Sequence, residues 1–300
     1  MNKIIFGIDE AGLGPTLGPL CYGWTGLIQT EGSNVLSRFD QLIKKYKLNI
    51  GDSKKIYQGV NKKKKLHQAL NEVLSLSQQT SEYQTLSDLW NLYPLNSFGE
   101  ISMYSYYEKC LKHSFAQLSV LERKDQFDGF CGFTASFEGE LNKEFDRGVN
   151  KSAVSMMKIG EIILSILNRF PIENIEIQVD KQGGRNFYED FLNDLFPFVG
   201  IQILRESSDE SIYMISEENR DIKIGFYKKG EDRFSLIACG SILAKWLREQ
   251  FMASFNSYWL TYNDVKPTAG YPEDAKRFIE VMSEYFEQDS MPINFIIRSR

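Results

Sequence analysis

The chain has 300 residues, of which 42% are hydrophobic and 25% are charged, the composition of a soluble globular protein. No apolar run approaches the roughly 20 residues that span a bilayer, and the first residues lack the apolar core of a signal peptide. We therefore expect a cytoplasmic protein without membrane contact. Histidine occurs only at His67 and His113, and the four cysteines form no CxxC pair. These counts disfavour zinc sites, disulfide frameworks and histidine-assisted nucleophiles.

The net charge of −5 argues against a broad nucleic-acid-binding surface. Two local basic segments depart from this average. Residues 54–65 hold six lysines and no acid, and Lys228 and Lys229 form a weaker second spot. Such a strip fits one polyanion in one groove, and it equally fits a solvated helix face.

Secondary-structure patterns in the first half predict a strand, its hairpin partner and two helices. The strands are expected at 3–9 and 20–29. The helices are expected at 33–46, behind a cap at Ser33, and at 61–77. Residues from about 80 to 149 have many aromatic residues and few clear periods. We interpret this range as an insertion or elaborated subdomain within a single domain spanning 1–300.

The second half predicts alternating helices and strands. A long helix is expected at 150–170, ending before Pro171, and a core strand at 173–180. Further expected elements are a helix at 188–196, strands between 200 and 229 with a hairpin turn at 217–220, and C-terminal helices at 235–255 and 272–286. This alternation indicates an α/β fold.

The segment 7–20, GIDEAGLGPTLGPL, combines acids with a glycine-rich turn. Adjacent acids at the end of a buried strand are costly unless something positive compensates them. Asp9 and Glu10 point to opposite faces of a regular strand, so we expect that they cannot both face one site unless the strand bends. Gly12 and Gly14 allow the chain to bend there and to approach a ligand.

Five motifs in order resemble those of ribonuclease HII, the type 2 ribonuclease H family: DEAG with GPxxGP, DSKK at 52–55, a strand ending in VD at 179–180, SLIACGSILAK at 235–245 and AGYPEDAK at 269–276. In style they are closest to the archaeal and eukaryotic catalytic-subunit branch. The resemblance implies a ribonuclease H-like fold, with a five-stranded mixed sheet flanked by helices.

The resemblance also implies four catalytic carboxylates. Asp9, Glu10 and Asp180 match by position, and the fourth is Glu231, ten residues before Ser241. Asp232 is the alternative if the alignment shifts by one residue. Four acids without competing His or Cys ligands are typical of Mg²⁺ or Mn²⁺, and a two-metal site is expected.

Substrate contacts follow from the same resemblance. A protein that distinguishes RNA from DNA must contact the 2′-hydroxyl. The glycine loop is expected to contact the ribose, a late tyrosine to stack on a sugar, and the DSKK lysines to hold phosphates; these nucleic-acid-binding residues are Gly12, Leu13, Gly14, Lys54, Lys55 and Tyr271. Leu13 departs from the family, which usually has Arg or Lys there, and the interval from Asp180 to Glu231 is longer than usual.

Together these observations predict a metal-dependent endoribonuclease that cuts the RNA strand of RNA–DNA hybrids or ribonucleotides embedded in duplex DNA. It would leave 5′-phosphate and 3′-hydroxyl ends and serve DNA replication and repair. We expect a monomer that binds the hybrid duplex, with a protein partner as a further option for the insertion. Two alternatives stay open: a nuclease of the same fold that acts on DNA, and a diverged non-catalytic nucleic-acid-binding protein.

Overall fold

The computed structural model describes residues 2–75, 105–107, 127–182, 184–288 and 291–300. Its centre is a mixed sheet that, in these ranges, has seven strands in the order β3-β2-β1-β4-β7-β6-β5. The strands are β1 (Lys3–Ala11), β2 (Leu20–Gln29), β3 (Gly129–Ser136), β4 (Asn174–Asp180), β5 (Ile201–Glu206), β6 (Glu210–Ser216) and β7 (Asp221–Tyr227).

The sheet corrects the prediction of five strands. β1, β4 and β7 are parallel, and the remaining strands pair antiparallel on either side of them. The predicted hairpin turn at 217–220 is confirmed, because Ser216 pairs with Asp221. β6 and β5 extend the sheet beyond β7, and β3, which falls in the range predicted as an insertion, extends it beyond β2. The long interval after Asp180 therefore adds strands at an edge, and β7 still pairs directly with β4.

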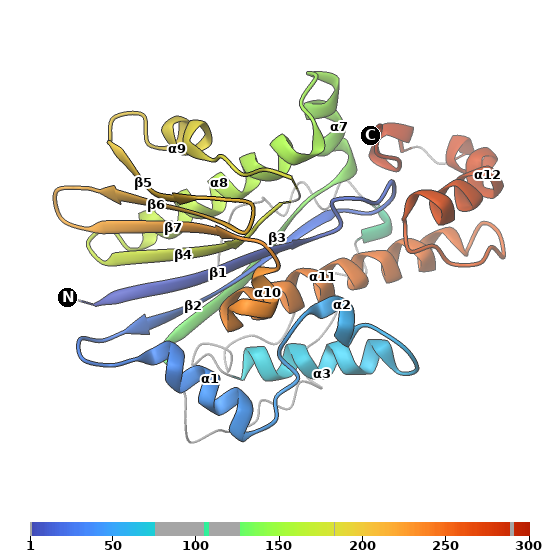
Figure 1. Cartoon of the computed structure of the whole chain (residues 1–300). Coiled ribbons are helices and arrows are strands. Elements are labelled where there is room, and N and C mark those ends of the chain that lie inside the picture. Colours follow the sequence, from blue (N-terminus) through green and yellow to red (C-terminus); the bar gives the residue numbers. More distant parts are fainter. Residues whose placement is uncertain (1, 76–104, 108–126, 183, 289–290) are drawn as a thin grey trace.

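Helices cover both faces of the sheet (Figure 1). They are α1 (Val35–Lys45), α2 (Ser53–Ile56), α3 (Lys62–Leu74), α7 (Glu138–Asp146), α8 (Lys151–Arg169), α9 (Glu189–Leu195), α10 (Gly230–Arg233), α11 (Ser235–Trp259) and α12 (Pro272–Gln288), with short 3-10 turns η2 (Ser105–Tyr107) and η3 (Ile293–Phe295). α1 is capped by the side chain of Asn34, which accepts from Ser37 N–H, and not by the predicted Ser33.

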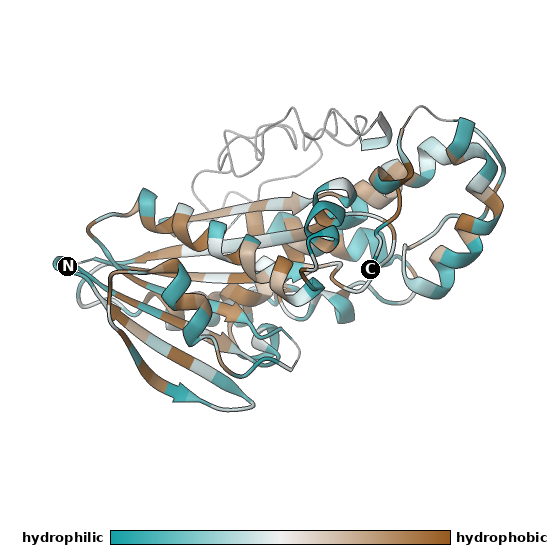
Figure 2. Cartoon of the chain, turned by 90° about the horizontal axis from the view of Figure 1, so that it is seen from above, coloured by the Kyte–Doolittle hydropathy of each residue, from teal (hydrophilic) through white to brown (hydrophobic). Residues whose placement is uncertain are grey.

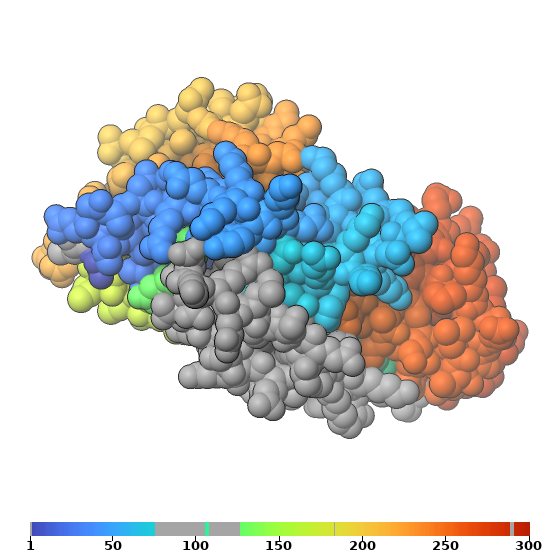
Figure 3. All heavy atoms as spheres, turned by 90° about the horizontal axis from the view of Figure 1, so that it is seen from below, coloured from blue at the N-terminus to red at the C-terminus, as the bar shows by residue number. Residues whose placement is uncertain are grey.

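Two hydrophobic clusters hold these layers together. One joins the sheet to α1, α3, α11 and α12, and the other joins its opposite face to α8 and α9. Figure 2 shows hydrophobic residues along the central strands and the helices beside them. Figure 3 shows α1 to α3 next to the C-terminal helices on one face of the molecule.

Small residues let α11 lie directly on β1 and β2. A Cβ added at Gly7 would be 2.2 Å from the carbonyl carbon of Leu236, and one at Gly23 would be 2.2 Å from Gly240 O. Real Cβ contacts do not come that close, so this crossing requires glycine at positions 7 and 23, and also at Gly240, where an added Cβ would lie 2.7 Å from Gly23 O. The contact fixes the first turns of α11 against the middle of β1 and β2.

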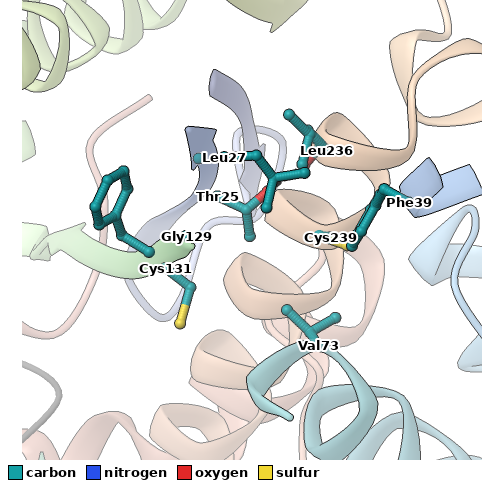
Figure 4. Close-up of a pocket in the computed structure, with 10 residues that line it drawn as sticks. Thr25, Leu27, Phe39, Val73, Gly129, Cys131, Leu236 and Cys239 are labelled. Atoms are coloured by element: carbon teal, nitrogen blue, oxygen red, sulfur yellow. Dashed lines mark hydrogen bonds between the residues drawn. The ribbon is translucent and has the colours of Figure 1, made fainter. Parts of the chain in front are cut away.

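A void of about 20 Å³ lies between β2, β3 and the helices α1, α3 and α11 (Figure 4). Its lining is mostly apolar and includes the thiols of Cys131 and Cys239. That volume holds about one water. Burial raises the pKa of the Cys131 thiol to about 12. Cys131 and Cys239 are buried and form no disulfide within the described residues, and so small a volume does not hold an organic ligand.

In the range predicted as an insertion, residues 129–136 form β3 and residues 138–146 form α7. Residues 80–104 and 108–126 lie outside the described residues, so the insertion stays a prediction. Among the helices that are described, we find no segment with the length and hydropathy needed to cross a bilayer.

Candidate active site

The four predicted carboxylates lie at one edge of the sheet. Asp9 and Glu10 stand near the end of β1, and Asp180 ends the adjacent parallel strand β4. Asp180 is in register with Tyr227, the last residue of β7. The chain then turns into α10, which carries Glu231. Because the carboxyl ends of parallel strands meet at one edge, these side chains converge although they are far apart in sequence.

Their pKa values show that the carboxylates interact. Burial, followed by the charges of Asp9 and Glu231, raises the pKa of Asp180 to about 8. Burial and the charge of Asp180 raise the pKa of Glu10 to about 7. Burial and the charge of Glu10 hold the pKa of Asp9 well above its ordinary value. Such a group of buried like charges is typical of functional sites.

Asp9 and Glu10 reach this edge from opposite faces of β1, as strand alternation requires. Glu10 N–H donates to Asp9 Oδ1 at 2.7 Å. Asp9 interacts with the hydroxyl of Ser241 on α11, while Glu10 interacts with Gln182, just beyond β4. The strand stays regular through Ala11. The charge of Asp180 acts on Glu10, and the charge of Asp9 acts on Asp180, so a regular strand places both acids in one cluster.

The turn into α10 distinguishes Glu231 from Asp232. Gly230 N–H donates to Asp180 Oδ1 at 2.7 Å, which ties the start of α10 to the cluster. The charge of Glu231 acts on Asp180 and helps to raise its pKa. Asp232 is exposed and pairs with Lys55 at 2.7 Å. The geometry therefore brings Glu231 into the group and leaves the alternative, Asp232, outside it.

The DSKK segment joins the cluster from α2. Asp52 caps the helix by accepting from Lys54 N–H at 2.8 Å. The buried Ser53 hydroxyl lies 2.9 Å from that of Ser241, the residue that interacts with Asp9. Burial lowers the pKa of Lys54, but the charges of Asp9 and Glu231 outweigh it and leave the pKa raised. Lys54 thus interacts electrostatically with the acid cluster, whereas Lys55 forms an ion pair with Asp232.

The chemistry of this donor set fits a hard divalent cation. Glu10 Oε2 and Glu231 Oε2 are buried and accept no hydrogen bond from the described residues, which is costly for a carboxylate oxygen without a cation. Within the same residues, no three His, Cys, Asp or Glu side chains are already arranged to hold a metal ion. Side-chain adjustment would be needed to gather these oxygens around one ion.

The glycine loop follows Glu10 on the same edge. Gly12 has φ +100°, a conformation that favours glycine. Leu13 is partly buried and packs against the hydrophobic cluster on the α8 side, whereas Gly14 is exposed. Lys151 Nζ, at the start of α8, donates to Gly14 O at 3.3 Å. A cation therefore stands beside this loop although Leu13 carries none.

Buried arginines hold the loop from beneath. Arg298 Nη1 donates to Gly12 O at 2.7 Å, and Arg298 Nη2 donates to Gly18 O. Glu138 accepts from Gly18 N–H at 3.0 Å. Burial and the charge of Arg248 lower the pKa of Arg298 to about 10, while Glu138 partly opposes this. These bonds satisfy the loop's backbone groups where water cannot.

Tyr271 lies on a second loop that Arg248 joins to the first. Arg248 Nη2 donates to Leu17 O at 3.2 Å and to Ala269 O at 3.0 Å. Its guanidinium is 5.6 Å from the centre of the Tyr271 ring, a cation–π distance. The ring is 49% exposed. One buried side chain thus contacts both elements that were predicted to face the ribose.

Sequence reasoning did not identify several residues that contact this region. Gln182 and Arg298 belong to no motif, and Glu138 falls in the range treated as an insertion. Arg248 lies three residues beyond the small-residue motif, and Ser241 served only to count back to Glu231. A buried charged residue has no signature in one sequence, so no pattern could have singled out these side chains.

Comparison with known proteins supports the fold. No protein-family model and no curated protein matches the sequence. Among solved structures, the ribonuclease H2 from Pyrococcus horikoshii OT3 is similar with a TM-score of 0.51 and 14% identity, over 98% of this chain and 92% of that one. A mutant form of Bst-RNase HIII is similar with a TM-score of 0.50 and 11% identity, over 98% of this chain and 65% of that one.

These similarities confirm that the chain has the α/β fold of type 2 ribonucleases H, as the motifs predicted. At such identities they bear on the fold alone. The assignment to the archaeal and eukaryotic branch stays a prediction.

Proposed function

We propose that this chain, which has the fold of type 2 ribonucleases H, is a metal-dependent endoribonuclease. Its substrate would be the RNA strand of an RNA–DNA hybrid, or a ribonucleotide embedded in duplex DNA. The observation that carries the proposal is the mutual interaction of Asp9, Glu10, Asp180 and Glu231, which raises the pKa of three of them. A fold selected for stability alone would not bury like charges together.

Each proposed residue has a task that follows from its surroundings. The oxygens of Asp9, Glu10, Asp180 and Glu231 would hold Mg²⁺ or Mn²⁺, which in a two-metal site supplies an activated water and stabilises the leaving 3′-oxygen. Gly230 N–H and the Ser241 hydroxyl would orient the carboxylates of Asp180 and Asp9. Hydrolysis breaks the bond from phosphorus to the 3′-oxygen, so the products carry a 5′-phosphate and a 3′-hydroxyl.

Recognition of the ribose is assigned to the glycine loop and Tyr271. Gly14 has open space where a side chain would lie, which leaves room for close backbone approach, whereas at Gly12 that space is filled by Arg248 and Pro19. An exposed tyrosine ring can stack on a sugar. Lys54 is assigned to the phosphate next to the acids because its charge already interacts with Asp9 and Glu231. For Leu13, only its backbone is assigned to the substrate, since its side chain packs inward.

The test is cleavage of a duplex that contains one or several ribonucleotides. We expect cleavage with Mg²⁺ or Mn²⁺, none in EDTA, and none by an Asp180→Asn variant. The matched control is Asp194→Asn, on α9 and outside the acid cluster, which should cut like the wild type. Activity that survives in EDTA or in Asp180→Asn would refute the proposal.

The same assay separates the two alternatives. Equal cleavage of an all-DNA duplex would indicate a nuclease that ignores the 2′-hydroxyl. Tight hybrid binding without cleavage, and without heat on titration with Mn²⁺, would indicate a non-catalytic binding protein.

A further inference from the structure

A charged hollow of about 510 Å³ lies beside the acid cluster. It is lined by Arg205, Asp209, Glu210, Lys228, Lys229 and Arg233, so four cations face two carboxylates. It includes the second basic spot of the sequence, which the proposed function leaves without a task. A local excess of positive charge on an acidic protein is a binding feature for an anion.

Glu210 holds two of the cations in place. Arg205 pairs with one of its oxygens at 2.8 Å and Arg233 with the other at 2.6 Å. The Arg233 guanidinium also lies 5.2 Å from the centre of the Tyr227 ring. One carboxylate shared by two arginines fixes them without neutralising both. Their remaining N–H groups form a pre-arranged set of donors.

The two lysines are less engaged. Lys228 is 3.8 Å from Asp209, and both side chains are more than half exposed, so this pair is weak. In the part of the chain that the structure describes, Lys229 has no ion-pair partner within 4 Å. Its backbone has φ +53°, a left-handed conformation that is uncommon for a lysine. That conformation sets the turn from β7 into α10.

The same turn connects the hollow to the acids. Lys229 directly precedes Gly230, whose N–H group binds Asp180. Within α10, Asp232 binds Lys55 of the first basic strip, and the charge of Lys229 also acts on Asp232. The short helix α10 is therefore in contact with both basic spots, and its Glu231 belongs to the acid cluster. Figure 1 shows α10 next to the strand ends.

We infer that the hollow formed by Arg205, Lys228, Lys229 and Arg233 binds the phosphodiester backbone of the nucleic acid as it leaves the acid cluster. This inference rests on the proposed function and assigns the second basic spot to the same substrate. A nucleic-acid strand that passes over the carboxylates needs cations on both sides of them, because the acids repel the negative charge of each flanking phosphate. Lys54 and its neighbours serve one side, and the hollow serves the other.

The test measures binding of a fluorescent RNA–DNA hybrid in the inactive Asp180→Asn background, at salt concentrations from about 50 to 200 mM. The double variant Lys228→Gln, Lys229→Gln should bind on the order of 10-fold more weakly. It should also lower the slope of log Kd against log salt by about 1 to 2, the loss expected for one or two phosphate contacts.

The matched control is Lys143→Gln, Arg147→Gln, which removes the same charge from exposed positions in and just beyond α7, after the opposite edge strand. It should keep the slope of the parent protein. Hybrids in which one phosphate at a time is replaced by a neutral methylphosphonate should then locate the contact. The replacement that weakens binding to the parent protein should not weaken binding to Lys228→Gln, Lys229→Gln, which has already lost that contact. Equal melting temperatures of the variants exclude a folding defect.

The outcomes separate this inference from the function on which it rests. If the parent and Lys228→Gln, Lys229→Gln bind the hybrid with the same slope of log Kd against log salt, the hollow is not a phosphate site. The proposed function is then unaffected. If the parent does not bind the hybrid, both ideas are wrong.

Discussion

Two buried charged regions of this molecule lie side by side and differ in how their charges are matched. At the strand ends, Asp9, Glu10 and Asp180 raise one another's pKa, and oxygens of Glu10 and Glu231 lack hydrogen-bond donors among the described residues. Beneath the glycine loop, Arg298 and Glu138 bind backbone groups and offset each other's charge. The first arrangement opposes folding and suits a ligand, whereas the second stabilises the loop.

The largest effect should come from Asp9→Asn. Loss of several kcal/mol of metal-assisted transition-state stabilisation corresponds to on the order of 10³-fold lower activity. In EDTA the free energy of unfolding of the same variant should be about 1 kcal/mol higher than that of the wild type, because one repelling charge is removed. Cleavage kinetics and urea titration measure the two effects. A variant that is both less active and less stable would contradict the contrast between the regions.

Arg298→Met should have the opposite consequence for stability. It removes the donors to Gly12 O and Gly18 O and leaves Glu138 buried without its cation, a loss of about 3–5 kcal/mol. Urea unfolding measures it, and Arg300→Met, at an exposed arginine, is the control. Equal stability of the two variants would mean that Arg298 does not support the loop.

Glu138 makes the supporting region dependent on pH. Burial raises its pKa from 4.5 to about 7, although Gly18 N–H, Tyr107 and Arg298 oppose the shift. The folded state therefore holds this proton more tightly than the unfolded chain. The contribution of Glu138 to stability is full below about pH 4.5 and is lost as the pH rises through about 7.

Glu138→Gln keeps an acceptor for Gly18 and Tyr107 but cannot titrate. Its free energy of unfolding relative to the wild type should rise by about 2 kcal/mol between pH 5 and 8. Urea titrations at several pH values measure the difference, and the shifts of Glu10 and Asp180 cancel because both proteins carry them. Parallel pH profiles would show that Glu138 titrates normally.

The smallest effect is expected for Asp232→Asn. Asp232 is exposed and binds Lys55, so its loss should change activity by no more than about twofold. Glu231→Gln should instead abolish most cleavage. The pair of variants, assayed side by side, decides which carboxylate belongs to the cluster, and the reverse result would move the site by one residue.

The sequence was informative where periodicity or motif order carries the signal. The predicted strands at 3–9, 20–29 and 173–180 correspond to β1, β2 and β4, and the long helices correspond to α8, α11 and α12. The number of five strands, which the family resemblance implied, was wrong, because the strands predicted between 200 and 229 join the same sheet and β3 lies in a range without a clear period. The acids were found through motifs, whereas the partners Gln182, Arg248 and Arg298 depend on contacts between distant segments.

The position of β5 and β6 outside β7 has a consequence for how such chains diverge. The distance along the chain between Asp180 and Glu231 can change without moving either side chain, since added residues accumulate at a free border of the sheet. The number of residues between the two motifs is therefore a poor measure of whether two proteins are related, and the pairing of their strands is a better one. Residues could be added in the turns at this border without disturbing the carboxylates, but β6 cannot be removed, because Tyr213 and Ile215 are buried in the core and Glu210 holds Arg233 of α10.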